Sequence, residues 1–197
     1  MFVLQVALLT NLECKRMSRA RKVKKGITSR RTAAGKSKTC RCTGRRAKGR
    51  SLVTKHGSDR IYTPDPLATD IVAHFRPCGS ILEPAAGKGA FVRAMPGCDW
   101  CEIDLDKNFF DCQARYDWIV TNPPYSIFTD FLAKAVEVAD NIVFLCPRNS
   151  WGMTSRVRIL ERAAFGMVES CRVPLPPPPW PQFGFVVTAT WDRGARP

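Results

Sequence analysis

The chain has 197 residues, enough for one domain with a substantial core and too few for two of ordinary size. Its net charge of +14 is confined to one end, because residues 1–60 carry 18 of the 31 Lys and Arg residues and only two acids. This distribution excludes a uniformly basic domain and predicts a near-neutral domain at 61–197 behind a basic tail at 1–60.

The tail is too polar to form a core. Its Lys and Arg residues are separated by few apolar side chains, so we expect residues 1–60 to be disordered in the free protein. Such a segment can bind a polyanion by releasing counterions, which favours nucleic acid as the partner. The alternative is a tail that only raises solubility.

The first twelve residues are largely apolar, but they are too short to span a bilayer and lack the basic start and cleavage site of a leader peptide. We therefore expect no association with membranes. The basic run begins directly after Met17. We hypothesise that translation starts at this methionine.

The nine cysteines are odd in number and irregularly spaced, and Cys146 lies within an apolar run. This is typical of reduced thiols in a cytoplasmic protein. Cys98 and Cys101 have the spacing of a redox motif but fall in a predicted strand, which favours core packing. No group of ligands has the regular spacing of a metal site, so we expect none.

Beyond residue 60, apolar periodicities of helix and strand alternate along the chain. Short strands separated by helices predict an α/β domain with a mostly parallel sheet covered on both faces. The expected elements in chain order are a helix at 67–75, a strand at 80–83, a helix at 90–95, strands at 99–103 and 118–121, a helix at 126–139, a strand at 142–146, a helix at 154–164, and strands at 167–173 and 183–191.

A glycine turn follows the first of these strands. Open α/β sheets bind ligands beyond the carboxyl ends of their strands, and Glu83 opens a loop there that contains Gly87 and Gly89. A carboxylate at this position would repel a pyrophosphate but suits a ligand with an ammonium or sulfonium charge. This argues against a nicotinamide dinucleotide.

An acid ends the next strand. Glu102, in Glu-Ile-Asp, lies about twenty residues further on, where a carboxylate commonly holds the ribose hydroxyls of a nucleoside. The alternative is a solvated strand end. A phosphate-binding P-loop is excluded at Gly35-Lys36-Ser37, because Arg30 replaces its first glycine and no strand precedes it.

The most specific feature is Asn122-Pro123-Pro124-Tyr125, directly after the strand at 118–121. Two prolines remove backbone donors and hold the peptide extended, so the Asn amide and a bare carbonyl can face a cleft. The tyrosine supplies a flat face for stacking. The alternative is a rigid loop without a ligand.

In this order, Glu-Pro-Ala-Ala-Gly-Lys-Gly-Ala-Phe, Glu-Ile-Asp and Asn-Pro-Pro-Tyr resemble the motifs of S-adenosylmethionine-dependent amino-methyltransferases. They resemble especially the DNA N(6)-adenine methyltransferases whose motif order begins with a Thr-Pro segment, here Tyr62-Thr63-Pro64. The likeness covers roughly residues 61–191. It implies a Rossmann-like methyltransferase fold with an antiparallel last strand, S-adenosylmethionine as cofactor, and DNA as the first choice of partner, with RNA as the second.

The resemblance also implies roles for single residues. Asn122 and the Pro123 carbonyl would accept hydrogen bonds from the target amino group, with Tyr125 stacking on a base flipped out of the duplex. Phe183 or Trp180 would cover its other face. Residues implied to bind the cofactor are Thr63, Glu83, Ala85, Gly87, Gly89, Glu102 and Asp111.

The chain departs from the family in two ways. Only six residues separate Asp104 from Asp111, which leaves little room for the family's usual helix and third strand. No target-recognition domain is recognisable either. RNA adenine and protein glutamine remain alternative methyl acceptors, and a catalytically silent nucleic-acid-binding module with the same fold remains an alternative of another class.

Overall fold

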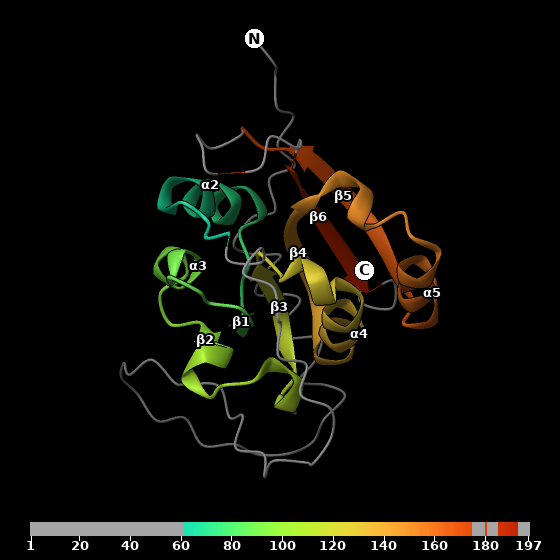
Figure 1. Cartoon of the computed structure of the whole chain (residues 1–197), viewed down its shortest axis with the longest axis horizontal. Coiled ribbons are helices and arrows are strands. Elements are labelled where there is room, and N and C mark those ends of the chain that lie inside the picture. The colour runs from blue at the N-terminus through green and yellow to red at the C-terminus, as the bar shows by residue number, and fades with distance from the viewer. Residues whose placement is uncertain (1–60, 175–179, 181–184, 193–197) are drawn as a thin grey trace. The chain divides into compact units, whose positions relative to one another are not determined.

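A single six-stranded sheet organises the computed structural model, which describes residues 61–174, 180 and 185–192. Four parallel strands lie side by side in the order β2-β1-β3-β4, and the antiparallel strand β6 separates β4 from β5 (Figure 1). The strands are β1 (Ile81–Glu83), β2 (Asp99–Trp100), β3 (Tyr116–Thr121), β4 (Ala139–Pro147), β5 (Phe165–Arg172) and β6 (Phe185–Asp192).

In the described part of the chain, four α-helices flank the sheet: α2 (Asp65–Phe75), α3 (Ala90–Ala94), α4 (Phe128–Val138) and α5 (Thr154–Arg162). Pro64 precedes α2, where a missing backbone donor costs nothing, and Arg76 ends it in a left-handed conformation with φ 46°. Helices α2 and α3 pack together on one side of the parallel strands and α4 on the other (Figure 1).

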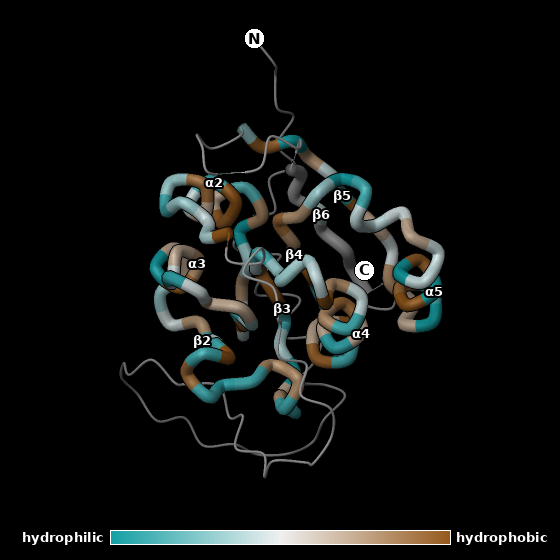
Figure 2. Tube along the Cα trace, viewed as in Figure 1, coloured by the Kyte–Doolittle hydropathy of each residue, from teal (hydrophilic) through white to brown (hydrophobic). Residues whose placement is uncertain are grey.

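The core has two layers, because alternate side chains of each central strand face opposite sides of the sheet. In β4, Ile142 and Phe144 pack in the layer that contains α4, while Val143 and Leu145 pack in the layer that contains α2 and α3. The apolar stretches of the strands and of the helix faces turned toward them are brown in Figure 2. Burial on both faces explains why β4 is apolar without alternation.

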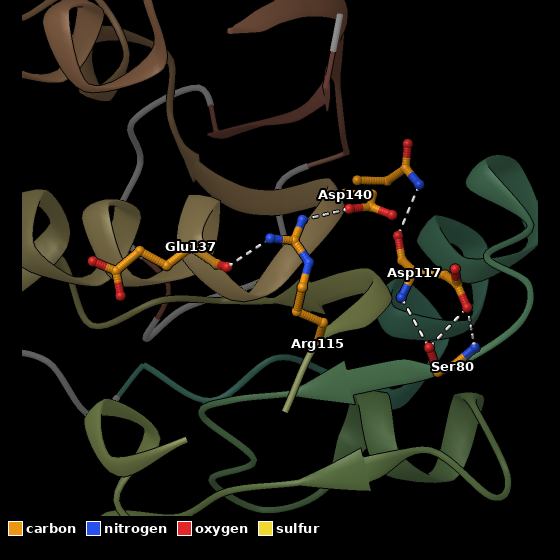
Figure 3. A network of polar contacts seen from close by, with 6 residues as sticks. Ser80, Arg115, Asp117, Glu137 and Asp140 are labelled. Atoms are coloured by element: carbon orange, nitrogen blue, oxygen red, sulfur yellow. Dashed lines mark hydrogen bonds and ion pairs between the residues drawn. The ribbon is translucent and has the colours of Figure 1, made fainter. Parts of the chain in front are cut away.

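A polar network ties the amino ends of β1, β3 and β4 together (Figure 3). Asp117 Oδ2 accepts hydrogen bonds from the Ser80 backbone and hydroxyl at 2.8 and 2.7 Å, and Arg115 reaches Asp140 at 2.7 Å. Gly79, with φ 85°, is required beside it, since a Cβ there would lie 2.4 Å from Asp117 Oδ2. These contacts fix the strands at the edge opposite their carboxyl ends.

The predicted α/β class, the mostly parallel sheet and the antiparallel last strand are confirmed. Strand β2 is shorter than expected, and η2 (Ile103–Leu105) and η3 (Phe109–Asp111) are short 3₁₀ turns between β2 and β3, in agreement with the little room found there. Strand β2 is an edge strand of the sheet.

The cysteines agree with the expectation in part. Cys98 and Cys101 are buried and form no disulfide, as core packing predicts, and Cys112, Cys146 and Cys171 form no disulfide either. Cys78 is disulfide-bonded, so the expectation of reduced thiols is wrong for this residue. Within the described residues, no helix has the length and apolar content needed to cross a membrane.

Candidate active site

The carboxyl ends of β1 and β3 meet where the order of the sheet reverses. From β1 the chain continues to β2 on one side, whereas from β3 it continues to β4 on the other. A crevice at such a switch point is where open α/β sheets bind ligands. Glu83 ends β1 and Asn122 directly follows β3, so the topology brings two of the predicted motifs together.

The glycine loop after β1 depends on backbone conformations that other residues adopt poorly. Gly87 has φ 51° and Gly89 has φ 80°. The loop is closed by a hydrogen bond from the Gly89 N–H to the Ala86 carbonyl at 2.7 Å. A Cβ at Gly87 would also lie 3.1 Å from the ring of Tyr62. Glycine therefore permits the close approach of the Tyr62 ring to this backbone.

Glu83 is a buried carboxyl with one unsatisfied oxygen. Its side chain is 1% exposed, and Oε1 accepts the Ala85 N–H at 2.9 Å. Oε2 and the nearby Thr121 hydroxyl oxygen both lack a hydrogen-bond partner of good geometry within the described residues. Burial raises the pKa of Glu83 to about 8, against partial lowering by Thr121 and Ala85. A ligand that brings a positive charge would favour the ionised carboxylate and satisfy its oxygens.

Glu102 lies just beyond β2 and binds the glycine loop that follows β1. Its Oε2 accepts the Gly87 N–H at 2.5 Å, and Oε1 accepts the Asp104 N–H at 3.3 Å. The carboxylate thus reaches the glycine loop, although 15 residues separate it from Gly87. Two parts of the predicted cofactor site lie together, and each carboxylate oxygen keeps lone-pair capacity for a further donor.

The Asn122 side chain makes hydrogen bonds at both ends of its amide. Nδ2 donates to the Ile61 carbonyl at 2.9 Å, and Oδ1 accepts the Tyr125 hydroxyl at 2.7 Å. Pro123 is buried, and Pro124 is extended with φ −64° and ψ 120°. Tyr125 is half-buried and packs against both core layers. The predicted amide acceptor is present, but a neighbouring hydroxyl occupies it.

Ile61 and Tyr62 form a segment to which the sequence assigned no role, although Tyr62 belongs to the Thr-Pro segment of the family resemblance. The Tyr62 carbonyl accepts the Trp180 Nε1–H at 3.2 Å, and Lys88 Nζ lies 4.7 Å from the centre of the Tyr62 ring. Tyr62 is 37% exposed. We call these two residues the 61–62 segment; it contacts the glycine loop, Asn122 and Trp180.

The other predicted site residues are less closely tied to this arrangement. Thr63 is half-buried beside the 61–62 segment, Asp111 is exposed at the end of η3, and Phe183 and the basic tail lie outside the described residues. Trp180 is 7% exposed within the core layer of α2 and α3, so little of its ring is open to a substrate.

One group of possible metal ligands occurs in the described part of the chain. Ligand atoms of His74, Glu169 and Cys171 lie within 4.8 Å of one another. His74 Nε2 and Glu169 Oε1 form a direct contact of 2.5 Å. This contact accounts for both groups without a metal ion.

No protein-family model and no curated protein matches the chain. Among solved structures, PH1948 from Pyrococcus horikoshii, a candidate RNA methyltransferase, shares 13% identity over 65% of this chain and 81% of its own, with a TM-score of 0.49. Trm5b from Pyrococcus abyssi shares 14% identity over 68% of this chain and 50% of its own, with a TM-score of 0.47. A TehB-like SAM-dependent methyltransferase from Corynebacterium glutamicum shares 14% identity over 64% of this chain and 87% of its own, with a TM-score of 0.42.

The chain therefore spans about half the length of Trm5b and most of the other two proteins. Identities and TM-scores of this size assign neither an activity nor a substrate to it. The case for a function rests on the residues of the site.

Proposed function

We propose that the chain is an S-adenosylmethionine-dependent methyltransferase that acts on the exocyclic amino group of adenine in DNA. One observation carries the proposal. Asn122-Pro123-Pro124-Tyr125 follows β3 at the switch point, next to the strand that ends in the buried Glu83 and the glycine loop. The motif that suits an amino group and the loop that suits a cationic nucleoside thus occupy neighbouring strand ends.

The residues fit this cofactor. Glu83 is a buried carboxyl without a partner for Oε2 among the described residues, which suits a ligand with positive charge. Gly87 and Gly89 leave the backbone accessible, and Glu102 offers a carboxylate beside them for ribose hydroxyls. When bound, S-adenosylmethionine would supply a methyl group activated by its sulfonium charge.

Asn122 and Pro123 would prepare the acceptor. The lone pair of an adenine amino nitrogen is conjugated with the ring, which makes it a poor nucleophile. Hydrogen bonds from its two protons to Asn122 Oδ1 and the Pro123 carbonyl would favour a tetrahedral nitrogen and hold it in line for attack. The nitrogen would exchange one of its protons for the methyl group that the cofactor supplies, the proton would leave to water, and the cofactor would depart as a neutral thioether.

Tyr125 would hold the base. Adenine inside a duplex cannot reach a crevice at a sheet edge, so the nucleotide must be flipped out of the stack. The Tyr125 ring would replace part of the lost stacking, which is worth about 1 to 3 kcal/mol per base. The 18 basic residues of the tail would add phosphate contacts without sequence preference.

Two other acceptors have specific support. The planar amide of a protein glutamine also fits Asn122 and the Pro123 carbonyl, and RNA adenine offers the same amino group as DNA. The basic tail favours nucleic acid over protein. A silent binding module of the same fold would have no need for the unsatisfied carboxyl of Glu83.

The test is a transfer assay with a cofactor that carries a deuterated methyl group. The full chain is incubated with adenine-containing duplex DNA, with RNA of the same sequence and with a glutamine peptide, and the products are measured by mass spectrometry. We expect labelled N(6)-methyladenine from DNA. Label found only in RNA or only in the peptide would show that this molecule, and not DNA, is the methyl acceptor. Cofactor binding measured by calorimetry, without label in any acceptor, would favour the silent module.

A further inference from the structure

The orientation of the Asn122 amide is set by a residue 61 positions earlier in the chain. An amide side chain can present either its oxygen or its NH₂ group to a ligand, and the two faces have opposite hydrogen-bonding character. The Asn122 Nδ2 donates to the Ile61 carbonyl at 2.9 Å. This bond turns Oδ1 toward Tyr125 and keeps the donor end away from it.

We propose that the 61–62 segment is a positioning element. It orients Asn122 Oδ1 toward the substrate, and it couples this orientation to the conformation of the glycine loop. The proposal rests on the proposed function, because it names the group that prepares Asn122 for an amino substrate. Ile61 supplies a carbonyl that only accepts, so it selects the Nδ2 end of the amide. The opposite orientation would present two donors to an amino group.

The same segment touches the predicted cofactor site. The Tyr62 ring lies against Gly87, where a Cβ would be 3.1 Å from it, and under the ammonium of Lys88. Its carbonyl is held by Trp180 Nε1, which is buried in the core. A ligand that displaces the Tyr62 ring would therefore also move the Ile61–Tyr62 peptide, whose carbonyl binds Asn122. Cofactor binding and the orientation of the Asn122 amide are coupled in this way.

The first test changes one backbone atom in the full chain. Incorporation of the α-hydroxy acid analogue of tyrosine at position 62 converts the Ile61–Tyr62 amide to an ester, which weakens the Ile61 carbonyl as an acceptor and keeps every side chain. We expect kcat to fall about three- to tenfold, the equivalent of one hydrogen bond, and Kd for S-adenosylmethionine to change as well, because the coupling acts in both directions. The matched control is the ester at position 63, which weakens the Tyr62 carbonyl bound by Trp180 instead.

We expect the control ester to change kcat much less than the ester at position 62. Equal losses of kcat in both esters, or no loss at position 62, would overturn the proposal. Failure of the parent chain to methylate any acceptor would instead contradict the proposed function, so the two failures are distinguishable.

A second test uses Asn122→Asp. Above its pKa this aspartate would place a carboxylate oxygen against the Ile61 carbonyl, and below its pKa the protonated oxygen can donate to it while the other oxygen still accepts. We expect the ratio of variant to parent kcat to rise as the pH is lowered. A ratio that is independent of pH, or one that falls, would contradict the role of the Ile61 carbonyl.

Discussion

The Tyr125 hydroxyl donates a hydrogen bond to Asn122 Oδ1 at 2.7 Å, so the proposed acceptor for the substrate is occupied by its own neighbour. An amide oxygen has two lone pairs, so a substrate amino proton would either share Oδ1 with this hydroxyl or displace it. In both cases the Tyr125 ring would remain available for stacking.

Removal of the Tyr125 hydroxyl alone should favour the substrate. Tyr125→Phe keeps the ring and frees Asn122 Oδ1, so we expect KM for DNA to fall several-fold, within the range of one neutral hydrogen bond of about 0.5 to 1.5 kcal/mol, with little loss of kcat. Steady-state kinetics on one duplex check this. A KM that rises, with kcat unchanged, would show that the hydroxyl helps to bind the substrate.

Tyr125→Ala and Asn122→Ala should fail at different stages. Loss of the ring removes stacking worth about 1 to 3 kcal/mol, so Tyr125→Ala should be impaired most on fully paired DNA, and a mismatch opposite the target adenine should partly restore it. Asn122→Ala loses a partner of the transition state, worth about 3 kcal/mol or a hundredfold in kcat, and a mismatch should not restore it. Equal responses of both variants to the mismatch would contradict base flipping by this motif.

Glu102 should contribute to cofactor affinity in two ways, by its negative charge and by its hydrogen bond to the glycine loop. Glu102→Gln can still accept the Gly87 N–H but loses the charge-assisted bonds to ribose, worth about 1.5 to 3 kcal/mol, so Kd for the cofactor should rise about tenfold or more. Glu102→Ala should weaken binding further because Gly87 is also released. An unchanged Kd in Glu102→Gln, measured by calorimetry, would indicate that Asp104 binds the ribose instead of Glu102.

Glu83 should make stability depend on pH. Its pKa is raised by burial to about 8 in the folded chain, above the usual 4.5, so the folded state holds a proton that the unfolded state has lost between these values. This contribution to stability is full below pH 4.5 and is lost as the pH rises through 8. Between about pH 5 and 8.5 the unfolding free energy of the parent should fall more steeply than that of Glu83→Gln. Parallel urea-unfolding profiles for the two proteins would show that Glu83 is not buried as a neutral acid.

The tail should determine the salt dependence of DNA binding. If its basic residues contact phosphates, the logarithm of affinity falls with the logarithm of salt concentration at a slope of about −0.9 per neutralised phosphate. Replacement of Arg41, Arg45, Arg46, Lys48 and Arg50 by glutamine in the full chain should make this slope less negative and leave cofactor affinity unchanged. Equal slopes before and after the change would leave the tail only a solubilising role.

Much of the fold and the strand-end motifs could be predicted because their signals are local. The double proline after Thr121 and the glycines after Glu83 interrupt apolar runs, which marks the strand ends directly. The mostly parallel sheet followed from the alternation of short strands and helices, and the antiparallel last strand from the family resemblance.

The contacts between distant residues could not be predicted from these signals. Ile61 and Asn122 are 61 positions apart, and the bond joins a backbone carbonyl, which every residue has, to a side chain. Trp180 was predicted to face the substrate because it is an aromatic in a loop, yet its ring is almost fully buried and holds the Tyr62 backbone. Periodicity does not report which polar groups meet across the sheet, so the network of Ser80 and Asp117 was also missed.

Modification-sensitive sequencing of genomic DNA from an expressing host shows directly whether the chain methylates the amino group of adenine. It should compare the parent chain with Asn122→Ala, produced at the same level in a host that lacks its own adenine methylation. We expect N(6)-methyladenine with the parent, and a loss of about a hundredfold with Asn122→Ala. Unmodified adenine with a folded parent that binds S-adenosylmethionine would contradict this expectation, and so would adenine methylation that persists unchanged in Asn122→Ala.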